Sequence, residues 1–233
     1  LAKLGAPVDP LAAERLARYH ALLLDWNERM NLTGDTAIET ALPRLYLDSL
    51  APLALEGLFP VGARVIDVGS GAGFPGLPLA IARPDLKVTL LDSLAKRVAF
   101  LDEVVAQLGL DNVRTAHARA EDAGRAPALR EAFDVAAARA VAAAPVLMEL
   151  LLPFVRSGGQ AVCYKGPAAE EELRAASRAA YLLGGGEVRA LPVAVPDQPE
   201  WQHCVLVCAK AQPTPARYPR KAGTPAREPL GGV

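Results

Sequence analysis

Apolar residues recur at helical spacing through the first sixty positions, and this pattern predicts two helices. Asp9-Pro10 is a favourable start for the first helix, with Asp9 as its N-cap and the proline in its first turn. "NLTG" (31–34) follows its last apolar position, and a second helical stretch covers about 37–55. Residues 1–60 are therefore expected to form an N-terminal helical extension. The apolar positions of the first helix are Ala12, Leu16, Tyr19, Leu23, Trp26 and Met30.

From Ala63 onward the pattern changes to short apolar runs that alternate with helical stretches. Such alternation predicts a parallel sheet with helices on both faces. The predicted strands are 63–69, 87–92, 113–118, 133–139 and 158–166, and the helices between and after them are 77–82, 93–109, 141–152 and 168–183. Two last strands, 187–193 and 203–210, have no helix between them and should pair as an antiparallel hairpin.

The expected fold is therefore α/β: a mostly parallel seven-stranded sheet that ends in an antiparallel hairpin, over residues 61–212. Residues 213–233 form a basic C-terminal tail without a core pattern. In 209–233, five basic residues stand against one acidic residue, Glu228.

Composition and net charge limit the classes of protein to which this chain could belong. The chain is 52% hydrophobic and carries a net charge of −1, which favours a folded domain and excludes a uniformly basic surface. Its three cysteines form no CxxC pair, so we expect a reducing cytosol, a cytoplasmic location and no metal site. The most apolar window, around 135–155, is interrupted by charges and prolines, so no membrane span is expected.

The candidate chemistry begins at "VIDVGSGAGFPG" (65–76), a glycine-rich loop after a buried strand. Its GxGxxG spacing fits a dinucleotide, and Asp92 at the end of the next strand could bind a ribose. S-adenosylmethionine also has a ribose, and Asp92 could equally be a helix N-cap. A tight structural turn is the alternative without a ligand.

Three features favour S-adenosylmethionine over a dinucleotide. Asp67, two residues before Gly69, suits a cationic methionine amine and would repel a pyrophosphate. Pro75 removes one of the N–H groups that would hold phosphate at the start of the next helix. The terminal hairpin also fits a class I Rossmann-like methyltransferase better than a parallel dinucleotide-binding sheet.

Several segments in this order resemble the RsmG (GidB) family of bacterial 16S rRNA guanine-N7 methyltransferases. They are "WNERMNLTG" (26–34), "LDSL" (47–50), "DVGSGAGFPGLPLAI" (67–81), "LLDSLAKRVAFL" (90–101), "RAED" (119–122), "ARAVA" (138–142), "KG" (165–166) and "YPRKAGTPAREPL" (218–230). The glycine motif is generic, whereas the first and last segments are far more specific. The chain departs from the family pattern at Ala138, where the family has serine, and at Leu45, where it often has histidine.

The resemblance implies an S-adenosylmethionine pocket built by Gly69, Gly71 and Phe74, next to Asp67, which the charge argument already assigns to the cofactor. It implies that Asp92 and Ser93 lie around the ribose and that Ala120 and Glu121 lie near the adenine. Arg139 matches an arginine of the family at the end of the fourth strand and is expected to bind the cofactor and to position the reacting groups, with no general base. The implied partner is 16S rRNA or the small ribosomal subunit.

Methyl transfer to guanine N7 needs no general base, because N7 already carries a lone pair. The sequence is consistent with this reaction. It has no Asn-Pro-Pro-Tyr motif, which is typical of methylation at an exocyclic amine, and no Pro-Cys nucleophile, which is typical of methylation at cytosine C5. Lys165, Arg220 and Lys221 are the candidate RNA-binding residues, through phosphate neutralisation. The three histidines, among them His203, are taken as structural. A dinucleotide-dependent oxidoreductase and a non-catalytic RNA-binding module remain the alternative functions.

Overall fold

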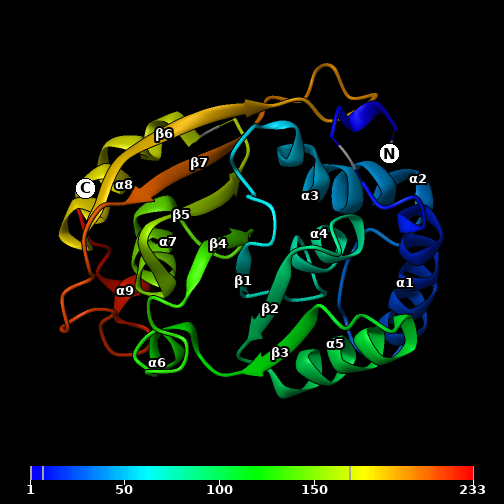
Figure 1. The fold of residues 1–233 in the computed structure, drawn as a ribbon, viewed down its shortest axis with the longest axis horizontal. Coiled ribbons are helices and arrows are strands. Elements are labelled where there is room, and N and C mark those ends of the chain that lie inside the picture. The colour runs from blue at the N-terminus through cyan, green and yellow to red at the C-terminus, as the bar shows by residue number, and fades with distance from the viewer. Residues whose placement is uncertain (1, 7, 168, 233) are drawn as a thin grey trace.

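A seven-stranded sheet crosses the centre of the molecule, with helices on both of its faces (Figure 1). The computed structural model describes residues 2–6, 8–167 and 169–232. The strands, in spatial order, are β3 (Val113–His117), β2 (Lys87–Asp92), β1 (Arg64–Val68), β4 (Phe133–Arg139), β5 (Val155–Lys165), β7 (His203–Lys210) and β6 (Gly185–Val193). The helices that follow the strands are α4 (Gly76–Ala82), α5 (Ala95–Leu108), α6 (Ala120–Ala123), α7 (Ala144–Leu151), η4 (Leu152–Phe154) and α8 (Ala169–Leu182).

The predicted topology is confirmed. Strands β1 to β5 pair in parallel, and β6 and β7 form an antiparallel hairpin. One feature was not foreseen: β7 lies between β5 and β6 and pairs antiparallel with both. The start of β7 consequently lies beside the end of β5, where Lys165 pairs with Cys204.

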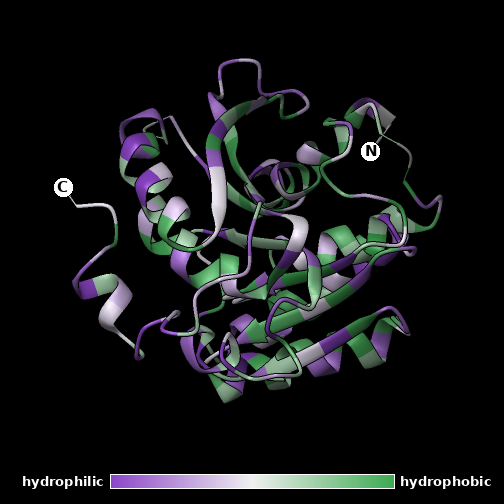
Figure 2. Ribbon diagram, turned by 60° about the vertical axis from the view of Figure 1, so that its left-hand side comes forward, coloured by the Kyte–Doolittle hydropathy of each residue, from purple (hydrophilic) through white to green (hydrophobic). Residues whose placement is uncertain are grey.

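Alternate residues of each strand enter two separate hydrophobic cores, as the two-residue period of a strand requires. Figure 2 shows the central strands largely in hydrophobic colours, whereas the surrounding helices alternate. Val65, Leu90 and Val162 pack on the face that α4 and α5 cover. Ile66 and Cys163 pack on the opposite face, which α7 and α8 cover. The sheet is therefore buried on both sides.

The N-terminal extension covers the first of these faces. Its elements are η1 (Ala2–Leu4), α1 (Ala12–Asn27), α2 (Ile38–Ala41), η2 (Leu42–Leu47), α3 (Asp48–Leu50) and η3 (Ala51–Ala54). The predicted second helix is thus a continuous helical run in which η2 is a π-helical turn. Pro43 lies in that turn and has no N–H to donate, which interrupts the α-helical hydrogen-bond pattern. The N-terminal turn differs from the prediction as well, because Asp9 accepts the Leu11 N–H and α1 begins at Ala12.

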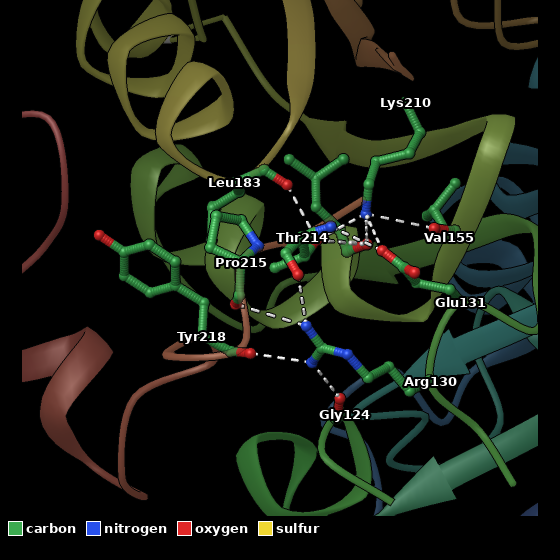
Figure 3. A network of polar contacts seen from close by, with 10 residues as sticks. Gly124, Arg130, Glu131, Val155, Leu183, Lys210, Thr214, Pro215 and Tyr218 are labelled. Atoms are coloured by element: carbon green, nitrogen blue, oxygen red, sulfur yellow. Dashed lines mark hydrogen bonds and ion pairs between the residues drawn. The ribbon is translucent and has the colours of Figure 1, made fainter. Parts of the chain in front are cut away.

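The C-terminal segment, residues 211–232, packs against the second face, so the expectation that it lacks core contacts is wrong. Tyr218 is buried, and the short helix α9 (Thr224–Arg227) contacts α7. Arg130 donates to the main-chain oxygens of Thr214 and Tyr218 (Figure 3). Beside it, the buried Lys210 ammonium donates to the main chain at Leu152. These bonds join distant parts of the chain, and a local sequence pattern does not register them.

Arg220 forms an ion pair with a buried carboxylate. Its Nε and Nη2 donate to the two carboxylate oxygens of Glu149 at 2.9 and 2.6 Å, and its main-chain N–H adds a third bond at 2.8 Å. Glu149 is fully buried in α7, and hydrogen bonding to it raises the pKa of the Arg220 guanidinium. A buried carboxylate needs a counter-charge, and Arg220 supplies it.

We expect Arg220→Ala to destabilise the fold, because it leaves the buried Glu149 carboxylate with one main-chain donor. The loss should be about 3 kcal/mol, or roughly 6–12 °C in the midpoint of thermal unfolding for a domain of this size. The control is Arg227→Ala, since Arg227 is 72% exposed in its side chain and pairs only with the exposed Glu228. That change should cost less than about 0.5 kcal/mol. Equal midpoints for Arg220→Ala and the wild-type protein would refute this role.

Candidate functional site

The candidate site lies at the edge of the sheet where the parallel strands end. Asp67 belongs to β1, Asp92 ends β2 and Arg139 ends β4. Lys165 ends β5, and His203 reaches the same edge because β7 begins there. Open α/β sheets bind their ligands at this edge.

The glycine loop joins β1 to α4 and bends back over the end of β2. Main-chain N–H groups of Gly69 and Ser70 donate to the Leu91 oxygen at 2.8 and 3.0 Å. Gly69 and Gly71 have φ of +77° and +59°, which disfavours residues with side chains. A Cβ on Gly69 would lie 2.8 Å from Val141, whereas one on Gly71 would meet no atom closer than 3.9 Å. The loop backbone at Gly71 therefore faces open space that a ligand could occupy.

Asp67 lies beneath this loop, fully buried. Its Oδ2 accepts the Gly76 N–H at 3.0 Å. Its Oδ1 has no partner, and no other buried side-chain nitrogen or oxygen in the described part of the chain lacks one. Burial raises the pKa of Asp67 to about 7, although the Gly76 N–H and Arg139 act in the opposite direction. An ionised carboxylate here needs a cation, and a ligand ammonium would supply one.

Asp92 uses both carboxylate oxygens to hold the main chain in place. Oδ2 accepts the Gly71 N–H and Oδ1 accepts the Leu94 N–H, each at 2.9 Å. The helix predicted over 93–109 begins later than expected, because α5 starts at Ala95 with Leu94 as its N-cap, so neither Asp92 nor Ser93 is the N-cap. Each oxygen of Asp92 keeps a second lone pair, so the ribose contact stays a prediction for Asp92 and Ser93.

The pair expected near the adenine lies at the start of α6. Ala120 is half-buried there, and the Glu121 carboxylate accepts the Gly223 N–H at 2.8 Å. The side chain of Glu121 therefore binds the C-terminal segment. A contact of either residue with a ligand remains a prediction.

Phe74 and Arg139 connect the glycine loop to the ends of β4 and β5. Phe74 is buried in an aromatic cluster, with its ring centroid 5.5 Å from Tyr19 and 5.3 Å from Tyr46. The Arg139 guanidinium lies over the Phe74 ring, 5.2 Å from its centroid. Its Nη1 donates to Asp48 Oδ2 at 3.0 Å and to the Arg44 oxygen at 2.9 Å. Arg139 thus ion-pairs with Asp48 of the N-terminal extension.

Asp48 and His203 are the two residues that sequence reasoning missed. Asp48 Oδ1 contacts His203 Nδ1 at 2.7 Å, and the Trp201 ring stacks on His203 with centroids 4.8 Å apart. Asp48 lies in the "LDSL" segment that helped to carry the resemblance, but nothing there indicated its partner. His203 had no spacing to mark it, and only the insertion of β7 next to β5 brings it here.

The candidate RNA-binding residues differ in their surroundings. The Lys165 ammonium donates to Glu172 Oε2 at 2.9 Å and to the Ala142 oxygen at 3.0 Å, half-buried at the site edge. Lys221 is exposed on the C-terminal segment. Arg220 is held by Glu149, which gives it a structural role, and its contact with phosphate remains a prediction.

The described residues contain neither a metal-binding cluster nor a membrane-spanning helix. In 2–6, 8–167 and 169–232, no group of three or more His, Cys, Asp and Glu side chains is arranged to hold a metal ion. None of the helices in these ranges combines the length and the apolar character needed to cross a membrane.

Comparison with known proteins gives consistent matches. The family model described as rRNA small subunit methyltransferase G matches residues 12–198. Ribosomal RNA small subunit methyltransferase G of Alkaliphilus metalliredigens is 45% identical over 98% of this chain and 95% of its own length. The protein of the same name from Moorella thermoacetica is 45% identical over 97% of this chain and 93% of its own length.

Among solved structures, the likeness extends to the fold alone. MtNAS in complex with MTA and tNA matches with a TM-score of 0.56 at 14% identity, over 84% of this chain and 71% of that one. TrmN from Thermus thermophilus matches with a TM-score of 0.50 at 21% identity, over 70% of this chain and 48% of that one.

We expect Phe74→Ala to lower the free energy of unfolding by about 3–4 kcal/mol, because it removes the ring between Tyr19, Tyr46 and Arg139. Urea unfolding followed by circular dichroism measures the change. Val61→Ala is the matched control, since Val61 is 88% exposed and should change stability by less than about 0.5 kcal/mol. A stable Phe74→Ala protein would mean that the ring serves a ligand rather than the core.

Proposed function

The chain belongs to the rRNA small subunit methyltransferase G family, and we propose that it transfers a methyl group from S-adenosylmethionine to N7 of a guanine in 16S rRNA. The observation that carries the proposal is the unpartnered Oδ1 of the buried Asp67, beneath the open backbone of the glycine loop. The substrate is 16S rRNA or the small ribosomal subunit, and the enzyme acts in the cytoplasm.

The residues at the strand ends fit this cofactor. The α-ammonium of S-adenosylmethionine is the cation that the Asp67 carboxylate requires. Its ribose hydroxyls can donate to the second lone pairs of Asp92. A dinucleotide fits less well, because a pyrophosphate at the loop would lie close to the buried Asp67 carboxylate and be repelled.

The protein's contribution to the reaction is position rather than proton transfer. S-adenosylmethionine supplies an activated methyl group on its sulfonium. Guanine N7 is already nucleophilic, so no residue needs to remove a proton before attack. Arg139 is held by Asp48 and by the Arg44 oxygen, beside the loop residue Phe74. A side chain fixed in this way can orient the target base, and orientation of the reactants can supply several kcal/mol of the barrier reduction.

RNA binding draws on basic groups around the same edge. Lys221 is exposed and available to phosphates. Lys165 lies at the edge of the site, where its ion pair with Glu172 holds it in place. It therefore contacts the target nucleotide rather than the more distant RNA backbone. Contacts of this kind weaken as the salt concentration rises.

The first test identifies the product. Small subunits or 16S rRNA from cells that lack the enzyme should accept one methyl group per molecule from S-adenosylmethionine. The modified RNA should then cleave at a single guanine after borohydride and aniline treatment. A methyl group on a ribose, an exocyclic amine or a pyrimidine carbon would contradict the proposed function, and so would the absence of any transfer.

The second test uses the raised pKa of Asp67. Below pH 7 the carboxyl group is largely protonated and must release its proton to bind an ammonium. Cofactor affinity should therefore rise up to about tenfold per pH unit until about pH 7 and then level off. Calorimetry in two buffers of different ionisation enthalpy should detect this proton. Asp67→Asn should abolish the proton release, whereas Asp25→Asn, on the outer surface of α1, should retain it.

The same raised pKa has a consequence for stability without the cofactor. Because the folded protein holds this proton more tightly than the unfolded chain, the stability it contributes is lost as the pH rises from about 4 through about 7. Asp67→Asn should lose less stability over that range. Unchanged proton release in Asp67→Asn would show that Asp67 does not bind the ammonium.

A further inference from the structure

A small cavity opens at the sheet edge beside Arg139, which also contacts Phe74 of the glycine loop. It has a volume of about 360 Å³ and lies between the N-terminal extension and the ends of β4 and β5. Asp48, Arg139 and His203 contribute their charged or polar groups to its wall, and Tyr164 and Lys165 close the side toward β5. Four separate stretches of the chain thus line one cavity that contains several charged groups.

The wall of this cavity presents hydrogen-bond donors beside acceptors. Nη1 of Arg139 binds Asp48 and two main-chain oxygens, whereas its Nε and Nη2 make no hydrogen bond within the described part of the chain. Each carboxylate oxygen of Asp48 accepts one bond, from Arg139 or from His203, and retains a second lone pair. A free guanidinium edge therefore lies next to a carboxylate that can accept further donors.

Guanine has the complementary arrangement. Its O6 is an acceptor, and N1–H and the 2-amino group beside it are donors, whereas adenine has a donor at position 6 and an acceptor at N1. A phosphate fits poorly, because the Asp48 carboxylate would repel it. An unstacked base in a pocket is read through this edge in enzymes that modify nucleic acids.

We propose that Asp48 and Arg139 select the target guanine, with Asp48 accepting from N1–H and the 2-amino group and Arg139 donating to O6. This proposal rests on the proposed function and names the residues that give it base specificity. O6 is next to N7 on the guanine ring. Because Arg139 lies between Asp48 and Phe74, a base held in this way turns N7 toward the glycine loop.

The surroundings keep the pair rigid, as a discriminating site requires. His203 fixes Asp48 from the second side and is itself stacked on Trp201. Ala140, which follows Arg139 and lines the cavity, has φ of +56°, a conformation that costs energy for a residue with a side chain. The strained backbone at Ala140 is therefore part of the cavity wall.

The substrate side of the test varies the base. Small subunits are reconstituted with 16S rRNA that carries guanosine, inosine or adenosine at the position mapped by cleavage. Inosine keeps N7, O6 and N1–H and lacks only the 2-amino group. The wild-type enzyme should methylate the guanosine substrate with a kcat/KM about 10- to 100-fold above inosine, and adenosine should react more slowly still. Equal rates for guanosine and inosine overturn the proposal without any variant.

The protein side of the test removes the acceptor. In Asp48→Asn the guanosine rate should fall, while the ratio of guanosine to inosine should drop to within about threefold of unity. The control Asp25→Asn should keep the wild-type ratio, since Asp25 pairs with Arg29 on the outer surface of α1. A purely structural role for Asp48 predicts that both substrates slow equally and the ratio stays unchanged, and that result also overturns the proposal.

Failure of the proposed function and failure of the Asp48 assignment give different results. If no guanine N7 is methylated in any substrate, the proposed function is wrong. If guanosine is methylated but the ratio is the same in wild-type and Asp48→Asn enzyme, only the assignment of Asp48 is wrong. Cofactor affinity, measured by calorimetry, should be unchanged in Asp48→Asn, because Asp48 lies in the cavity beyond Arg139 rather than under the loop.

Discussion

Burial of the sheet on both faces is the constraint on which the remaining structure depends. The helices that alternate with the strands cover much of each face, and the two ends of the chain cover more. The N-terminal extension joins the core that contains Val65 and Leu90, and the C-terminal segment adds Tyr218 to the core that contains Cys163. Because the sheet holds both ends of the chain, each end can also place a group at the site. The N-terminal extension places Asp48 beside Arg139, and the C-terminal segment donates a main-chain N–H to Glu121.

The hydrogen-bond partners of the carboxylates distinguish those that stabilise the fold from those that could bind a ligand. Glu149 has a bidentate arginine, and Asp92 has two main-chain donors. These donors offset the cost of burying a charge. Glu149 is therefore structural, whereas each oxygen of Asp92 keeps a lone pair for the predicted ribose contact. Asp67 alone, among the buried side-chain groups described, leaves an oxygen without a partner, and its pKa is raised accordingly. Under the proposed function, the cofactor ammonium would offset this energetic cost, so cofactor affinity and fold stability would both depend on Asp67.

Local patterns predicted the elements well and the long-range pairings poorly. Strands β2, β4 and β7 occupy the ranges expected from their apolar runs, and the helix predicted over 93–109 ends at Leu108 with Gly109 as its left-handed C-cap. The spacing of Asp67, Gly69 and Asp92 marked the ligand edge because strand ends meet there in any parallel sheet. The position of β7 between β5 and β6 had no local signal, and His203 was therefore taken as structural. The same limit explains Arg220, whose partner Glu149 lies 71 residues away.

The position of β7 between β5 and β6 also adds a residue to the candidate site. A purely parallel edge would bring together only residues from strand ends, which here are Asp67, Asp92, Arg139 and Lys165. An antiparallel strand begins where its parallel neighbour ends, so it adds the first residue of a strand, His203, to the same edge. His203 then meets Asp48 from the extension, and their contact holds the acceptor next to Arg139. The sequence pattern changes near residue 60, but residues from both sides of that boundary line the cavity proposed to bind the guanine.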